Sequence, residues 1–262
     1  MYNGKRLATY NKDALRWKLS NNVILDANAG IDRRYTHAKD IAVISPPKII
    51  DHSDTTFHWI KNNSSKSNIN KRQREYYEKV CELVKAKHGE DDKTLIVTHN
   101  QHERFLIDCL REHGFYRIGV GSAYKGEDIA VAHFGAIIGQ NYWRDFNKVW
   151  VIASPNLPME VYPLHWSFFS GLAIRNHSRK MYPVKSKGRY RFKNEKFEDV
   201  RHGSLVSEIY QAIKRINREG RVSSEIYVVH SDEDVVNEVR NQLRNVKIGP
   251  TTRLDIDLPE NM

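Results

Sequence analysis

Short apolar runs alternate along the chain with longer segments of helical periodicity. Runs that are rich in β-branched residues and bounded by polar residues predict buried strands. Six such runs are present: Val23–Ala27, Ile41–Ile44, Thr94–Thr98, Ile129–His133, Lys148–Ala153 and Ile226–Val229. Helical periodicity occurs in four segments: Lys71–His88, Gln101–His113, Leu205–Arg218 and Asp232–Leu243. This alternation predicts crossover connections and therefore an α/β protein with a parallel sheet and flanking helices.

Two polar tracts interrupt the alternation. Lys61–Arg72 has few residues that could pack in a core, and we predict that it is a connector. Arg175–Lys196 mixes basic and aromatic residues and is too polar to be core. We expect the second tract to form a β-hairpin that turns at Ser186–Gly188. In the last helix, Ser231 is the expected cap, and the helix dipole explains the acids that follow it. Capping therefore accounts for the His230–Asp234 cluster better than a metal site does.

The composition favours a packed protein with an anionic partner. Of the 262 residues 40% are hydrophobic, and the formal charge is +10. A surplus of Lys and Arg attracts DNA, RNA or an acidic membrane face, of which nucleic acid is favoured. The only cysteines, Cys81 and Cys109, fall inside helical patterns, so neither a disulfide framework nor a thiolate metal site is indicated. No apolar run approaches a membrane span, and we expect a cytoplasmic protein without a membrane partner or a metal.

One face of the predicted helix Leu205–Arg218 carries candidate chemistry. At 100° per residue, Gln211, Arg215 and Arg218 fall together, away from the apolar side. Two arginines with a glutamine beside them form a donor array suited to phosphate. A solvated basic helix face explains the same spacing.

The segment Gln211–Arg218 resembles motif VI of superfamily 2 helicases of the DEAD/DEAH type, in which a glutamine precedes a pair of arginines. The resemblance implies that Arg215 and Arg218, with Gln211, are catalytic. In that family the arginines reach the γ-phosphate of an ATP held by the other lobe. One departure is Lys214, which stands where the family has a glycine that permits close approach.

Two loops resemble further motifs of the same family. Gly139-Gln140-Asn141 resembles motif V, which implies that Gly139 and Asn141 contact the nucleotide. The segment after the strand Thr94–Thr98 resembles motif IV. Ordinary turn chemistry explains either loop alone. The residues that motif IV would place on the nucleic-acid backbone are Thr98, His99 and Asn100.

The resemblance also implies a domain organisation. Val23–Ala29 is similar to the motif III strand, and the residues before it contain neither a GxxxxGK[ST] phosphate loop nor an acidic pair for magnesium. We therefore expect residues 52–250 to form a RecA-like C-terminal lobe with an insertion at about 160–202, and residues 1–50 to be a remnant of the first lobe. ATP and Mg²⁺ would bind only if a separate chain supplies that lobe, so the isolated chain is expected to be inactive.

The basic hairpin is expected to bind a single strand, because its charges follow a backbone while its aromatic rings stack on bases. The alternative is a solvated hairpin that serves solubility. The residues expected to make these contacts are Lys185, Lys187, Arg189, Tyr190 and Arg191.

The function implied by the resemblance is the nucleic-acid-binding, arginine-finger-donating half of an ATP-dependent helicase or translocase, in replication of a mobile element. The main alternative is a non-catalytic nucleic-acid-binding protein derived from such a motor. A nuclease or phosphoesterase that uses Asp26 and scattered histidines is disfavoured, because no acidic cluster recurs at strand ends to hold two metals.

Overall fold

The computed structural model describes residues 23, 26, 28–45, 48–121, 125–174, 181–184, 189–218, 223–254 and 256, with the side chains of 181–184 and 189 left out. The chain divides into two compact units. Lys48–Asn156 and Glu208–Met262 form the first, which we call the sheet unit. Met1–Pro47 and Leu157–Ser207 form the second, which we call the helical unit.

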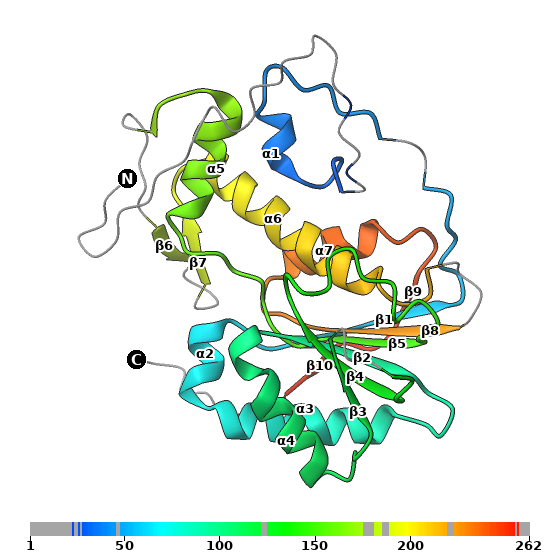
Figure 1. The fold of residues 1–262 in the computed structure, drawn as a ribbon. Coiled ribbons are helices and arrows are strands. Elements are labelled where there is room, and N and C mark those ends of the chain that lie inside the picture. Colours follow the sequence, from blue (N-terminus) through cyan, green and yellow to red (C-terminus); the bar gives the residue numbers. More distant parts are fainter. Residues whose placement is uncertain are drawn as a thin grey trace. The chain divides into compact units, whose positions relative to one another are not determined.

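The sheet unit is built on a parallel sheet with the strand order β10-β1-β8-β5-β2-β4-β3, and β9 pairs with β1 (Figure 1). Every pairing in this sheet is parallel. The predicted α/β class with a parallel sheet is therefore confirmed. The strands are β1 (Thr55–Lys61), β2 (Thr94–Thr98), β3 (Ile118–Val120), β4 (Ile129–His133), β5 (Lys148–Val151), β8 (Ser224–Val229), β9 (Lys247–Ile248) and β10 (Thr252–Arg253).

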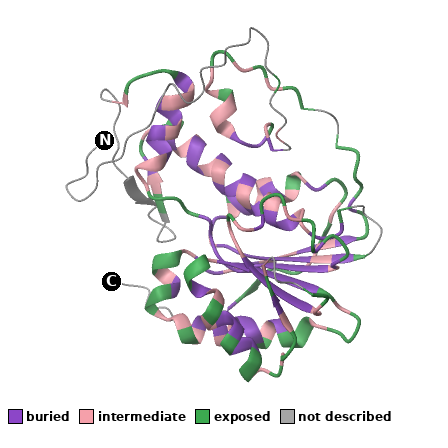
Figure 2. Cartoon of the chain, viewed as in Figure 1, coloured by how far each residue is buried: buried purple, intermediate pink, exposed green. Residues whose placement is uncertain are grey.

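Helices flank both faces of this sheet (Figure 1). One face carries α2 (Lys66–Lys71), α3 (Gln73–Lys87), the short 3₁₀ helix η2 (Asn100–His102) and α4 (Glu103–Glu112). The other carries α7 (Glu233–Asn241) and the last turn of α6 (Glu195–Ile213). Because both faces are covered, the central strands are almost wholly buried, as Figure 2 shows. This burial explains why their sequences are continuous apolar runs.

One core cluster of the sheet unit lies between the sheet and the helices α3 and α4. Tyr77 on α3 is completely buried, and its hydroxyl lies 2.8 Å from Thr98 Oγ1 and 2.9 Å from His102 Nδ1. Trp150 and Tyr227 stack face to face on neighbouring strands, with ring centroids 3.9 Å apart. The buried hydroxyl of Tyr77 is thus matched by hydrogen bonds inside this core.

In its described residues, the helical unit contains two helices, a hairpin and most of α6. Its elements are α1 (Arg33–Thr36), α5 (Val161–Ser170), β6 (Met181–Val184), β7 (Arg189–Phe192) and α6 up to Ser207. Strands β6 and β7 pair antiparallel, which confirms the predicted hairpin, while its predicted turn Ser186–Gly188 lies outside the described residues. Phe192 is buried in a cluster with Tyr162, Trp166, Phe197 and Val200, so this arm does contribute to a core, contrary to the prediction.

Three predicted elements differ from the structure. Ile41–Ile44 forms no strand, and Ile44 is 88% exposed. The tract Lys61–Arg72 is more than a connector, because it contains α2 and buries Ile69. Helix α7 begins after Asp232, whose side chain accepts a hydrogen bond from the amide of Asp234, so the expected cap at Ser231 is wrong by one residue. Of the predicted strand Val23–Ala27, only positions 23 and 26 lie within the described residues.

The predicted helix Leu205–Arg218 is wrong at both ends. Helix α6 begins at Glu195 and ends at Ile213, so Arg215 and Arg218 lie beyond it. Asn217 adopts a left-handed φ of 40°, and its amide donates to the main-chain oxygen of Phe146 at 3.2 Å. A tertiary hydrogen bond thus replaces the helical one, which the apolar periodicity of the segment could not reveal.

Within the described part of the chain, no helix is both long enough and apolar enough to cross a membrane.

Candidate phosphate and nucleic-acid site

Two segments far apart in sequence meet beyond the end of α6. Arg215 Nη1 donates to the main-chain oxygen of Gln140 at 3.3 Å, and Arg218 Nη1 donates to the side-chain oxygen of Asn141. The structure therefore brings the predicted arginines and the predicted Gly139–Asn141 loop together. We call Lys214, Arg215 and Arg218 the basic cluster.

Local backbone geometry sets this arrangement. Gly139 has a φ of 75° and Asn217 one of 40°, both in the left-handed region that glycine and asparagine tolerate best. A Cβ added at Gly139 would meet no atom within 4 Å, so backbone conformation rather than space favours glycine there. The Asn217 side chain also donates to Ser224 Oγ at 3.2 Å, which fixes the turn against the start of β8.

The basic cluster is an electrostatically strained site. Burial and the neighbouring charge of Arg218 lower the pKa of Lys214 to about 8. Lys214 Nζ lies 3.4 Å from His52 Nε2, and burial together with Lys214 lowers the pKa of His52 to about 4. His52 is therefore neutral at pH 7 and accepts a hydrogen bond from the ammonium group.

The positive charge of Arg215 is also disfavoured by its surroundings. Burial, and then repulsion by Arg218, lower its pKa, and the attraction of Glu208 is a smaller effect. Its Nε is buried and has no hydrogen-bond partner in the structure. A buried N–H without a partner is costly, and an anion beside it would satisfy this donor and relieve the repulsion between the cations.

The cluster lies at the amino ends of the strands. His52 precedes β1, and the hydrogen bond between Asn217 and Ser224 places the turn at the first residue of β8. Ligands of open parallel sheets usually bind at the opposite, carboxyl edge. The motif VI-like arginines are therefore not at the edge where such sheets bind nucleotides.

The residues predicted from motif IV lie at the carboxyl end of β2, away from the basic cluster. Thr98 is 0% exposed and its hydroxyl is bonded to Tyr77, so it has no surface for a nucleic acid in this structure. Burial, followed by the charges of His102 and Lys66, lowers the pKa of His99 to about 4. The Nε2 atom of His99 is buried without a partner, while Asn100 is exposed.

Sequence reasoning missed two serines at this carboxyl edge. Ser64 follows β1 and Ser154 follows β5, and their hydroxyl oxygens lie 2.8 Å apart. Ser64 also donates to the main-chain oxygen of Val229 at 2.6 Å. The rule that parallel strands gather their carboxyl ends at one edge could have paired these loops, but no motif drew attention to them.

The remaining predicted residues are dispersed. Gln211 stays on the last turn of α6 while the arginines lie beyond its end, so the predicted single-face array does not form. In the hairpin, Tyr190 is 65% exposed, whereas Arg191 Nε lies 3.9 Å from Glu198 Oε1. Lys185, Lys187 and the side chain of Arg189 lie outside the described residues.

Comparison with known proteins gives distant structural likenesses. No family model matches the sequence, and no curated protein matches it. The chain is similar to E. coli DEAD-box protein SrmB in its complex with regulator of ribonuclease activity A, with a TM-score of 0.40 and 14% identity over 82% of this chain and 100% of that chain.

Two further solved structures are similar. The C-terminal domain of the DEAD-box protein Dbp5 has a TM-score of 0.40 and 11% identity over 77% of this chain and 90% of that chain. T4 UvsW has a TM-score of 0.29 and 12% identity over 69% of this chain and 42% of that chain. The assignment of a parallel sheet is based on the strand order of this chain and not on these likenesses.

Proposed function

We propose that the sheet unit binds the phosphate backbone of a nucleic acid through the basic cluster and the Gly139–Asn141 loop. The observation that carries this proposal is a cluster of three cations, Lys214, Arg215 and Arg218, in which the buried Nε of Arg215 has no hydrogen-bond partner. A phosphate oxygen can accept from several guanidinium and ammonium donors at once. The formal charge of +10 adds a long-range attraction for the same polyanion.

The main-chain and side-chain oxygens of the loop support a positioning role. Gln140 and Asn141 hold one nitrogen of each arginine, which leaves the rest of both guanidinium groups for a ligand. An arginine fixed in this way loses less side-chain entropy on binding than a free one does. The loop would then orient the donors, and the arginines would bind the phosphates.

The arginine-finger role is a second candidate. Its support is the meeting of the motif V-like loop with the motif VI-like arginines. Its weakness is that both arginines are already bonded to their own chain and lie at the amino edge of the sheet. In this reading the chain would serve a motor whose ATP and Mg²⁺ are held by a separate polypeptide, in replication of a mobile element.

Equilibrium binding of fluorescent oligonucleotides tests the proposal. The double variant Arg215→Ser/Arg218→Ser should bind an oligonucleotide more weakly by roughly tenfold or more, because each charged hydrogen bond contributes about 1.5–3 kcal/mol. Arg111→Ser/Arg253→Ser removes the same charge from exposed positions of the sheet unit and is the matched control. Equal affinities of the two variants would refute the assignment of the site.

The hairpin gives a second arm of this experiment. Lys185→Ser/Lys187→Ser/Arg189→Ser tests the proposed contacts of the arm with a single strand. Preference for unpaired DNA or RNA over a duplex is expected if Tyr190 stacks on bases, and Tyr190→Ser should then reduce that preference. If only these variants weaken binding, the interface is the hairpin and not the basic cluster.

A further inference from the structure

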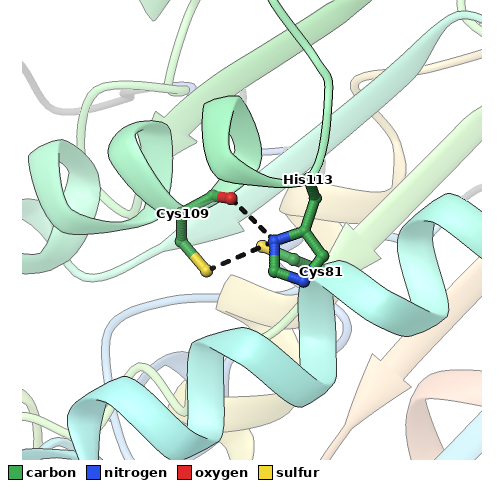
Figure 3. Close-up of side chains that lie close together, drawn as sticks. All are labelled: Cys81, Cys109 and His113. Atoms are coloured by element: carbon green, nitrogen blue, oxygen red, sulfur yellow. Dashed lines mark hydrogen bonds between the residues drawn. The ribbon is translucent and has the colours of Figure 1, made fainter.

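Helices α3 and α4 bring three metal-ligating side chains together on the face of the sheet that they cover. These are Cys81 on α3, Cys109 on α4 and His113, which caps α4 (Figure 3). Their two sulfur atoms and one ring nitrogen of His113 all lie within 4.8 Å of one another. No pattern in the sequence predicts this cluster, because 27 residues separate the two cysteines and the packing of two helices joins them.

The separation of the ligand atoms fits a tetrahedral ion. Zinc lies about 2.3 Å from sulfur and 2.0–2.1 Å from nitrogen, so two tetrahedral ligands of these kinds are about 3.6 Å apart. Cys109 Sγ and His113 Nδ1 are 3.9 Å apart. Only small side-chain movements would be needed, and Cys109 and His113 are spaced i, i+4 on one helical face.

A hydrogen bond already links the two sulfur atoms. The S–H of Cys81 donates to Cys109, and this hydrogen bond lowers the pKa of Cys109 while the same bond and burial raise that of Cys81. Metals ligate the thiolate form of cysteine, so binding requires loss of both thiol protons. A bound cation would in turn favour loss of the second thiol proton.

The histidine can change its tautomer at little cost. His113 Nδ1 lies 2.8 Å from the main-chain oxygen of Cys109, so it carries the proton and donates it in this structure (Figure 3). The same oxygen accepts from the main-chain amide of His113 at 3.1 Å. If the ring proton moves to Nε2, the carbonyl keeps a donor and Nδ1 becomes free to coordinate.

We propose that Cys81 Sγ, Cys109 Sγ and His113 Nδ1 bind one zinc-class ion, with water as the fourth ligand. The pair of thiols and one imidazole is a soft ligand set that favours zinc over magnesium or calcium. Binding releases the two thiol protons, and the proton on His113 moves from Nδ1 to Nε2. The ion fastens α3 to α4, independently of any nucleic acid at the basic cluster.

Cobalt and zinc titrations of the reduced full-length chain test this site. Co²⁺ should bind with one equivalent and give a thiolate-to-cobalt charge-transfer band, which Zn²⁺ should abolish by displacement. The variant His113→Gln should bind zinc at least about tenfold more weakly, since even loss of a supporting second-shell partner costs about 10–100-fold. His37→Gln, at a histidine of the helical unit, should leave zinc affinity unchanged.

The cysteine variants complete the test. Cys81→Ser and Cys109→Ser should each remove the charge-transfer band, and zinc should raise the thermal unfolding midpoint of the wild type but not of these variants. If a serine variant fails to fold, the wild-type spectrum and His113→Gln still decide the question. Absence of the thiolate band from folded, reduced wild type overturns the proposal. So does formation of a Cys81–Cys109 disulfide in a protein whose reduced form binds no cobalt.

Discussion

Arg215 donates through Nη1 to the main-chain oxygen of Gln140 at 3.3 Å, and this bond joins the end of α6 to the loop between β4 and β5. The second arginine, Arg218, donates to the side chain of Asn141 in the same loop. Two segments that resemble separate helicase motifs therefore form one positively charged site. The site is held by irregular backbone, not by the face of a helix.

Lys214 predicts a pH dependence of anion binding. Its pKa of about 8 means that the cluster loses a positive charge as the pH rises through that value. Oligonucleotide affinity should therefore fall between about pH 7 and 9. Lys214→Met should bind more weakly at pH 7 and lose most of this pH dependence. A pH profile that is the same for both proteins would exclude Lys214 from the site.

The lowered pKa of Lys214 also predicts that the free energy of unfolding rises with pH, whereas oligonucleotide affinity falls. The folded pKa of Lys214, about 8, is below its ordinary value of 10.5, so between these values the unfolded chain binds more protons. The contribution of Lys214 therefore increases stability as the pH rises from about 8 to 10.5. Urea unfolding should show a smaller rise over this range for Lys214→Met. An identical rise would mean that Lys214 is not strained.

An ion network at the amino end of β5 is expected to stabilise the sheet. Lys148 Nζ lies 2.6 Å from Asp92 Oδ2 and 2.9 Å from Glu225 Oε2, and all three side chains are largely buried or half-buried. Lys148→Met would leave two carboxylates without their cation. Loss of one partner of a buried ion pair costs about 3–5 kcal/mol, and we expect the lower end here because Glu225 retains solvent. Urea unfolding at pH 7 measures this loss.

Acid should weaken the same network. Burial is the largest single effect and opposes the charge of Asp92 and of Glu225. The hydrogen bond and the charge of Lys148, together with smaller contributions from other neighbours, outweigh it and lower the two pKa values below 3.8 and 4.5. Their contribution to stability is therefore complete above those ordinary values and is lost as the pH falls through the lowered ones. Lys148→Met should be less sensitive to acid than the wild type in this range. Equal sensitivity would contradict the network.

ATP hydrolysis tests the motor reading. The sequence contains no GxxxxGK[ST] loop, which in phosphate-loop enzymes cradles the phosphates and contributes to magnesium binding. The purified chain should therefore show no magnesium-dependent ATPase activity, with or without oligonucleotide. Hydrolysis that disappears on Arg215→Ser would require a complete catalytic site within this chain.

The sequence predicts the sheet better than the site. Strands such as Thr94–Thr98 and Ile129–His133 were predicted with their bounds correct, because buried parallel strands are continuous apolar runs with polar ends. The end of α6 was not predicted, because the apolar stripe continues through Ile216, and only the tertiary bond from Asn217 to Phe146 ends the helix earlier. Local periodicity carries no information on such long-range bonds.

The site residues show the same limit. Gly139, Asn141, Arg215 and Arg218 were selected from motif resemblance, and tertiary folding brings them together. The approach of Lys214 to His52 depends on a contact between residues 162 positions apart, which no local pattern encodes. The pairing of Cys81 with Cys109 likewise depends on how α3 packs against α4.

The salt dependence of oligonucleotide binding tests the central claim most directly. For single strands, the slope of the logarithm of the binding constant against that of the salt concentration is about −0.7 for each phosphate contact. Arg215→Ser/Arg218→Ser should therefore flatten the slope by about 1.4, since two contacts are lost. Arg111→Ser/Arg253→Ser should keep the wild-type slope. A folded Arg215→Ser/Arg218→Ser protein with the wild-type slope would contradict phosphate binding by the basic cluster.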